Sequence, residues 1–344
     1  MIELKSATLA VSFPEKPFQP ELRIEFQRTL RIPDDGKNYP LPPGLGRFPL
    51  RHIDDYAPRI PQAWLKRGGV LLPMWQAEAL WMNFIGEYIP GRPSYYPFAI
   101  KVATGKVNAV TGELWKGGLS RNPQDYLVVP GQPWLDGYCV EKGIIRQFVA
   151  MPLGQGFSVE EQVTGQAEFG GIQLEVFPMK PEVFDRRFPV IREKGVRSRG
   201  AVMEDMCLSK KAACEMGLAP GGRMQQEIYE DPFSIHDWDT SHSSRCFVHL
   251  VNSTTWRAIT GEAPPTTPPT PKDYTQAGFP WFDYYDAELN AVKGSKVLDG
   301  LKSVNEKLIE KRQEPLSDNE SENVLNVKNL RPRSTRHQVR ETDF

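Results

Sequence analysis

The clearest pattern in the sequence is an alternation of apolar and polar positions. Between residues 22 and 32, every second position carries an apolar side chain, with one exception at Arg28, and the positions between them are polar. Side chains of a β-strand point alternately to the two faces of its sheet, so this pattern predicts a strand with one buried face. Residues 2–13 are expected to supply a partner strand.

The densest alternation lies between residues 123 and 180, where short apolar runs are separated by glycine and proline turns. Such spacing is typical of consecutive strands in an antiparallel sandwich or barrel. The strands predicted in this part of the chain and its surroundings cover residues 95–103, 126–129, 144–151, 157–163, 172–178 and 245–251. Gly154 and Gly156 are expected to form a hairpin turn.

Residues 70–86 are strongly apolar, and their spacing fits a strand and a helix equally well. In either conformation we expect core packing by Trp75, Leu80, Trp81 and Phe84.

Few segments have helical spacing. One helix is predicted at 201–217, where Gly217, Gly221 and Gly222 would end it. A short helix should begin at an Asn252–Ser253 cap and end at Gly261. A third, amphipathic helix is predicted at 297–311.

Together these elements predict a β-rich α+β fold, with antiparallel sandwich or barrel-like sheets, a few short helices and a disordered C-terminal tail. The predicted organisation is a β-rich body at 1–180, a basic linker or excursion at 181–200, a mixed part packed on the body at 201–290, a C-terminal helix at 291–312 and a disordered tail at 313–344. The tail is polar and has no periodic pattern.

Three segments, PQDYLVVPGQPWLDG, IRQFVAMPLGQG and FPWFDYYD, resemble a family of bacterial and fungal proteins of uncharacterised function. The resemblance covers most of residues 70–290. It implies that this part of the chain is one integral domain, and it implies no activity.

Composition narrows the functional classes. A formal net charge of -1 argues against a nucleic-acid-coating role, which needs an excess of Lys and Arg. No basic region precedes an apolar run at the start of the sequence, and no apolar run is long enough to span a bilayer. These features predict a soluble cytoplasmic protein without a membrane partner. The four cysteines form no CxxC pair and are expected to be reduced thiols, although two disulfides in a secreted protein remain an alternative.

One segment concentrates side chains that can bind a metal. His236, Asp237, Asp239, His242 and His249 lie within fourteen residues, together with Cys246. Imidazole and carboxylate groups suit zinc or non-haem iron if three of them converge. The spacing is not that of an HExxH helix, and the same residues fit a turn in which Asp and Ser cap backbone amides.

A second candidate site is the segment PGQPWLDGY. An exposed Trp134 beside Gln132 and Asp136 would suit a sugar or a peptide. The alternative is a core tryptophan at a corner between strands.

A proline-rich run offers a third candidate contact. Pro264, Pro265, Pro268 and Pro269 predict extended chain that either recruits a partner or serves as a spacer.

The first functional hypothesis is therefore a soluble, non-catalytic binding or structural protein whose ligand is an unknown small molecule, sugar or protein. The alternative is a metal-dependent enzyme that uses the His/Asp cluster at 236–249.

Overall fold

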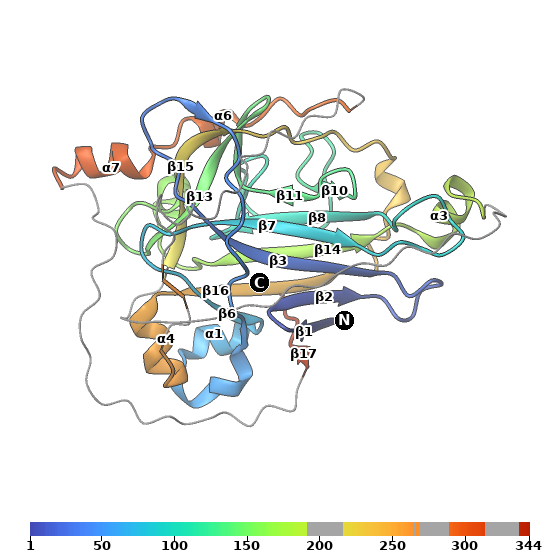
Figure 1. Ribbon diagram of the computed structural model, residues 1–344, viewed down its shortest axis with the longest axis horizontal. Coiled ribbons are helices and arrows are strands. Elements are labelled where there is room, and N and C mark those ends of the chain that lie inside the picture. Colours follow the sequence, from blue (N-terminus) through green and yellow to red (C-terminus); the bar gives the residue numbers. More distant parts are fainter. Residues whose placement is uncertain (191–215, 264–265, 268–288, 314–336) are drawn as a thin grey trace.

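The computed structural model describes residues 1–190, 216–263, 266–267, 289–313 and 337–344. In these residues the chain forms two extensive sheets and a few short helices, which confirms the predicted β-rich α+β class (Figure 1). Within this part of the chain neither sheet closes on itself, so the architecture is two open sheets and not a barrel.

The first sheet has ten strands: β1 (Ile2–Lys5), β2 (Thr8–Ser12), β3 (Glu21–Thr29), β4 (Asn38–Tyr39), β7 (Ala79–Gly86), β11 (Trp134–Leu135), β12 (Gly137–Glu141), β13 (Ile144–Pro152), β15 (Met216–Gln225) and β17 (Gln338–Val339). Their order is β17-β1-β2-β3-β7-β13-β15-β4, with β11 paired to β7 and β12 paired to β13. The β15–β4 pair is parallel, and the other pairs of this sheet are antiparallel.

The second sheet has seven strands: β5 (Arg51–His52), β6 (Val70–Pro73), β8 (Phe98–Thr104), β9 (Val107–Asn108), β10 (Leu127–Val129), β14 (Ile172–Pro178) and β16 (Ser244–Val251). The order is β10-β8-β14-β16-β6-β5, with β9 paired to β8. Strands β15 and β16 follow residue 215, yet both pair with strands from the first 180 residues. Both sheets are therefore built from both halves of the chain.

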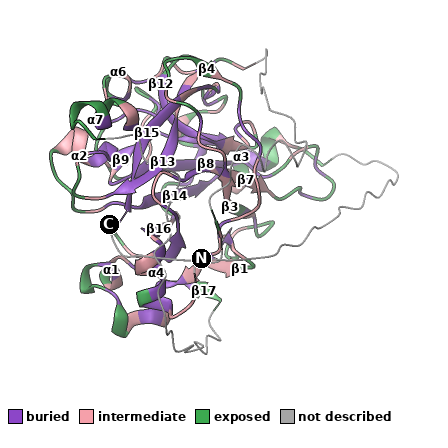
Figure 2. Ribbon diagram, turned by 60° about the vertical axis from the view of Figure 1, so that its left-hand side comes forward, coloured by how far each residue is buried: buried purple, intermediate pink, exposed green. Residues whose placement is uncertain are grey.

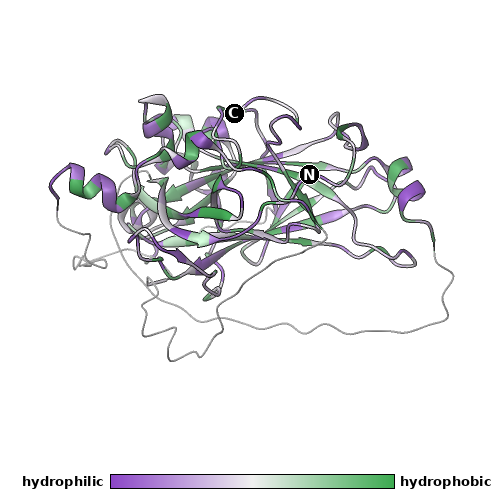
Figure 3. Cartoon of the chain, turned by 90° about the horizontal axis from the view of Figure 1, so that it is seen from above, coloured by the Kyte–Doolittle hydropathy of each residue, from purple (hydrophilic) through white to green (hydrophobic). Residues whose placement is uncertain are grey.

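The described helical segments are short: η1 (Ile53–Arg59), α1 (Gln62–Arg67), α2 (Val159–Thr164), α3 (Pro181–Arg187), η2 (Ile235–Asp237), α4 (Ser253–Thr260), α6 (Lys296–Asp299) and α7 (Val304–Glu310). Hydrophobic residues dominate the central strands, whereas α3 and α7 at the rim carry hydrophobic and hydrophilic residues side by side (Figure 3).

One large hydrophobic cluster takes side chains from both sheets. Leu22, Ile24 and Phe26 of β3 belong to it, as do Val102 of β8 and Val248 of β16. The central strands are accordingly buried, and exposed residues gather on helices and loops (Figure 2). A smaller cluster packs η1, α1 and α4 against β6 and the end of β16 through Ile53, Trp64, Leu71, Val251 and Trp256.

Several predicted elements are confirmed. β3 has Leu22, Ile24 and Phe26 buried and alternates as expected. The predicted strands around β8, β10, β13, β14 and β16 are also present. Asn252 caps α4, because its side chain accepts hydrogen bonds from the amides of Thr254 and Thr255, and the helix ends at Gly261. The ambiguous residues 70–86 form two strands, β6 and β7.

Two predictions failed because a capping box was overlooked. Residues 157–163 were expected to be a strand after a hairpin turn at Gly154 and Gly156, but α2 follows that turn. The predicted helix at 297–311 is divided into α6 and α7, and α7 starts at a new N-cap. In both helices a serine caps the amide of a glutamate three residues later, and the glutamate returns a bond to the serine amide, as in Ser158–Glu161 and Ser303–Glu306.

The predicted helix at 201–217 overlaps the described residues only at its end, where the chain is already in β15. Gly221 and Gly222 do not stop a helix. A Cβ atom at Gly222 would lie 2.4 Å from the carbonyl oxygen of Pro33, and one at Gly221 would lie 2.6 Å from a methyl group of Val149. These glycines therefore permit close packing of a strand.

The prediction of a disordered tail is wrong for its last eight residues. Residues 337–344, which we call the strap, contain β17 and pair with β1. Residues 314–336 lie outside the described part of the chain, so the rest of that prediction is untested.

The β12–β13 pair provides a test of this packing. A Cβ atom at Gly137 would lie 2.0 Å from the carbonyl oxygen of Arg146 on the neighbouring strand. We expect Gly137→Ala to lower the free energy of unfolding by about 1–3 kcal/mol. Gly117→Ala is the matched control, because nothing lies within 4 Å of its added Cβ. Urea unfolding should show a change within about 0.5 kcal/mol for the control. Equal midpoints for the two variants would contradict this packing.

Candidate functional site

Strand register places a row of polar and aromatic side chains on the outer face of the first sheet. Thr8 of β2 lies opposite Glu25 of β3, Glu25 lies opposite Asn83 of β7, and Asn83 lies opposite Trp134 of β11. Directly opposite residues have Cβ atoms about 4.5–5.5 Å apart, so these four side chains form one continuous line across four strands. We call this line the outer-face row.

Glu25 holds the row together. Its carboxylate accepts hydrogen bonds from Thr8 (3.2 Å), Gln27 (3.1 Å), Arg47 (3.2 Å) and Asn83 (3.4 Å). The side-chain amides of Gln27 and Asn83 donate their NH₂ groups to Glu25, which leaves their carbonyl oxygens as acceptors. The hydrogen bonds to Glu25 therefore fix the positions of these two acceptors.

Two tryptophans flank these polar groups. Trp81 lies opposite Gln27 in the next register position, and its ring meets the ring of Trp134 edge to face, with centroids 6.3 Å apart. Both rings are half-buried. The indole N–H of Trp81 is shielded from solvent and has no hydrogen-bond partner among the described residues. Buried indole N–H groups usually have a partner, so this atom is a vacant donor.

Of the three predicted ligand-binding residues, Trp134 reaches the surface and the other two do not. Gln132 is buried and bonds the backbone of Trp134, Glu227 and Tyr229. Asp136 is buried and exchanges hydrogen bonds with Gln226. Burial raises the pKa of Asp136 to about 8, although the bond from Gln226 opposes the shift. Both side chains brace the chain after β15 and so help to fix the position of Trp134.

A second unusual group lies where β3 and β7 meet. Glu78 is buried, and its Oε1 atom lies 3.7 Å from Nε of Arg28 without a hydrogen bond from any described residue. Its Oε2 atom accepts from the amide of Trp75. Burial raises the pKa of Glu78 to about 7, and the charge of Arg28 limits the rise. Arg28, the exception in the β3 pattern, therefore faces a carboxyl group.

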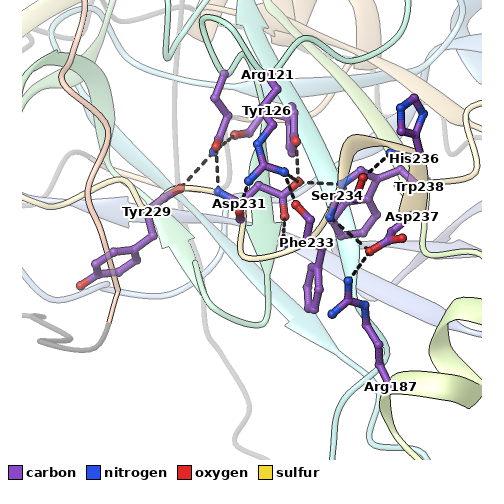
Figure 4. Close-up of polar contacts among 11 residues, drawn as sticks. Arg121, Tyr126, Arg187, Tyr229, Asp231, Phe233, Ser234, His236, Asp237 and Trp238 are labelled. Carbon is purple, nitrogen blue, oxygen red and sulfur yellow. Dashed lines mark hydrogen bonds and ion pairs between the residues drawn. The ribbon is translucent and has the colours of Figure 1, made fainter.

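The five residues predicted to bind metal do not converge. Asp237 caps η2 and pairs with Arg187 (2.7 Å), and His236 beside it is exposed (Figure 4). Asp239 pairs with Lys16 and also contacts His242 at 3.0 Å. Burial raises the pKa of Asp239, but the bonds from Lys16, Ser241 and His242 outweigh it and hold that pKa well below its usual range.

His249 lies apart from the other four. Its ring is buried against Trp64, with centroids 5.0 Å apart, and Nε2 lies 2.9 Å from the carbonyl oxygen of Gly68. Burial lowers the pKa of His249 to about 3. Cys246 is also buried. Across the residues that the structure describes, no group of three or more His, Cys, Asp or Glu side chains is arranged to hold a metal ion.

The predicted proline contact falls largely outside the described residues, since Pro264, Pro265, Pro268 and Pro269 are not among them. Between them, the carbonyl oxygen of Thr266 accepts from the indole N–H of Trp75 (2.7 Å), and that of Thr267 accepts from Arg28.

A buried carboxylate that was not predicted from the sequence, that of Asp231, lies just before the His/Asp segment 236–249. Asp231 accepts hydrogen bonds from Tyr126 (2.5 Å), Trp238 (2.9 Å) and the amide of Phe233 (2.8 Å), while Arg121 binds its backbone carbonyl (Figure 4). Burial and the bond to Asp231 raise the pKa of Tyr126 far above its usual range. All of these groups have partners, which indicates a structural role.

Glu25, Asn83 and Trp81 were also missed as site residues. The sequence placed Trp81 in the core, because the strand or helix state of residues 70–86 was undecided. A strand assignment would have put Trp81 and Asn83 on the face opposite Leu80 and Phe84, which are buried. No local signal could have brought Glu25 beside them.

Comparisons with protein-family models, curated proteins and solved structures found no match. The resemblance of residues 70–290 to a bacterial and fungal family therefore stays a prediction. Among the residues described here, no helix is long and apolar enough to cross a membrane.

The Asp231 network can be tested by truncation. Asp231→Ala would leave a buried hydroxyl, a buried indole N–H and an amide without an acceptor, so we expect a loss of about 3 kcal/mol or more in unfolding free energy. Tyr126→Phe removes one bond and one donor together and should cost about 1 kcal/mol. Chemical denaturation measures both, and similar losses would show that Asp231 is not the central acceptor.

Glu78 predicts a pH-dependent difference in stability. The carboxyl group has its ordinary pKa of 4.5 when unfolded and about 7 when folded, so the native state binds the proton more tightly. The stabilisation of the folded state by protonated Glu78 is complete below about pH 4.5 and is lost as the pH rises to 7. Between pH 4.5 and 8, the free energy of unfolding of the wild type should fall by on the order of 3 kcal/mol relative to that of Glu78→Gln.

This difference isolates Glu78, because Asp136 and His249 titrate alike in both proteins and cancel. Unfolding free energies measured from pH 5 to pH 8 should converge at the acidic end and diverge at the basic end. Parallel curves would show that Glu78 has no raised pKa.

Proposed function

We propose that the protein is a binding protein that takes a hydroxyl-rich, ring-shaped ligand, of the saccharide class, on the outer face of the first sheet. The observation that carries this proposal is the outer-face row itself, in which Glu25, Asn83 and Trp134 occupy directly opposite positions on adjacent strands. Trp81 lies beside the row, and its ring meets that of Trp134 edge to face.

The chemistry of the row matches such a ligand. A sugar ring has an apolar face of C–H groups that can pack on an indole, and Trp134 and Trp81 provide two such surfaces. Its hydroxyl groups can donate to the amide oxygens of Asn83 and Gln27. Sites of this kind combine aromatic walls with a few well-placed polar groups.

The row is also preorganised. The bonds to Glu25 fix the rotamers of Gln27, Asn83 and Arg47, so less side-chain entropy is lost when a ligand binds. The buried Gln132 and Asp136 hold the backbone around Trp134, which limits movement of that strand.

Isothermal titration with a panel of neutral oligosaccharides, with affinity gel electrophoresis for polysaccharides, tests the proposal. Trp134→Ala and Asn83→Ala should each weaken binding of a positive ligand at least about tenfold, since aromatic anchors and polar contacts of this kind carry roughly 1–3 kcal/mol. Tyr88→Ala is the matched control, because Tyr88 is an exposed aromatic residue (51%) outside the row. Absence of saccharide binding, or equal affinity of Trp134→Ala and wild type, would reject the proposal.

A further inference from the structure

The strap, residues 337–344, lies along the body in an extended conformation. In the first sheet, Val339 pairs with Ile2 and Gln338 with Glu3, and the amide of Leu4 donates to the carbonyl oxygen of His337 (2.7 Å). Next to the second sheet, the amide of Gly69 donates to the carbonyl oxygen of Arg340 (3.1 Å). The strap thus adds a strand to the open edge of β1 and also reaches the turn before β6.

Individual side chains of the strap form specific hydrogen bonds with the rest of the protein. The Arg340 guanidinium forks onto the Asp54 carboxylate, with bonds of 2.7 Å from Nη2 to Oδ1 and 3.1 Å from Nε to Oδ2, and it also donates to the carbonyl oxygen of Leu65. The Glu341 carboxylate accepts from the amide of Arg245 (2.9 Å). A fork of this kind combines binding energy with geometric selectivity.

Thr342 and Phe344 of the strap also contact the rest of the protein. The hydroxyl of Thr342 donates to the carbonyl oxygen of Arg67. The Phe344 ring lies against Trp115 and Phe247, with centroids 5.4 and 5.7 Å away. The body is shaped for this approach: a Cβ atom at Gly68 would lie 2.6 Å from the Arg340 carbonyl oxygen.

The attachment is mostly polar and therefore releasable. Val339 is the strap's fully buried side chain, whereas His337, Gln338 and Asp343 are exposed. Only two residues of the strap enter the ladder. This is how an edge strand captures an extended peptide, with backbone bonds for affinity and side-chain pockets for specificity.

We propose that β1, η1 and the turn before β6 form a recognition groove for this extended segment, and that the strap of a second copy of the chain can replace the chain's own. Residues 314–336 join the strap to the rest of the chain. An exchanged strap would make the same contacts as the original one, so exchange costs little beyond the entropy of association. The chain's own strap competes at an effective concentration on the order of millimolar.

Two complementary full-length variants test the exchange. Arg340→Ala weakens the strap and leaves the groove intact, whereas Asp54→Ala weakens the groove and leaves the strap intact. Each alone should remain a monomer. Mixed, they should form a one-to-one dimer by native mass spectrometry, because the intact strap of one chain can enter the intact groove of the other. A mixture that behaves as the sum of its parts would overturn the proposal.

A labelled peptide with the sequence of residues 337–344 provides an independent measurement. By fluorescence anisotropy it should bind the Arg340→Ala chain at least about tenfold more tightly than wild type, in which the tethered strap competes. A peptide carrying the same Arg-to-Ala change should bind at least about tenfold more weakly. Arg186→Ala, a change of an exposed arginine on α3, should behave as wild type.

If Arg340→Ala does not fold, Phe344→Ala replaces it in both experiments, because it removes a peripheral ring contact of the strap. Failure of the peptide to bind a folded strap variant, or equal affinity of the two peptides, would overturn the proposal.

Discussion

The structure depends above all on the antiparallel pairing of β3 with β7. This pairing runs from Leu22–Gly86 to Thr29–Ala79 without a break. It turns the apolar residues of both strands toward the core and turns Glu25 and Asn83 outward, side by side. Because side chains alternate with a period of two, a slip of β3 by one residue would turn Glu25 toward the core and expose Phe26. Core packing and the outer-face row are thus two results of one register.

The strand β3 could be predicted from the sequence, but its pairing with β7 could not. Alternation from Leu22 onward identified β3 and even marked Arg28 as exceptional. The partner of Arg28, Glu78, is fifty positions away, and the sequence contains nothing that relates the two. Trp81 shows the same limit within one segment, because apolar content alone did not reveal to which face of β7 it belongs.

Proximity in sequence was a poor guide to chemistry. The His/Asp residues at 236–249 are close along the chain, but η2, the following turn and β16 carry them to different partners: Arg187, Lys16 and Gly68. Conversely, the strap was expected to be disordered because it is polar, yet its polar groups find partners on η1, on β16 and before β6. Short-range signals that were present, the Ser158–Glu161 and Ser303–Glu306 capping boxes, would have corrected the strand predicted at 157–163 and the single helix predicted at 297–311.

The central claim is that β3 and β7 pair in the register that sets Glu25 opposite Asn83. Disulfide formation tests it directly, since directly opposite positions have Cα atoms within the range that a disulfide spans. Mild oxidation followed by peptide mass spectrometry should show a cross-link in Glu25→Cys/Asn83→Cys. In Glu25→Cys/Met82→Cys, where the side chains point to opposite faces, no cross-link should form. A cross-link in the second pair and none in the first would contradict the register and, with it, the outer-face row.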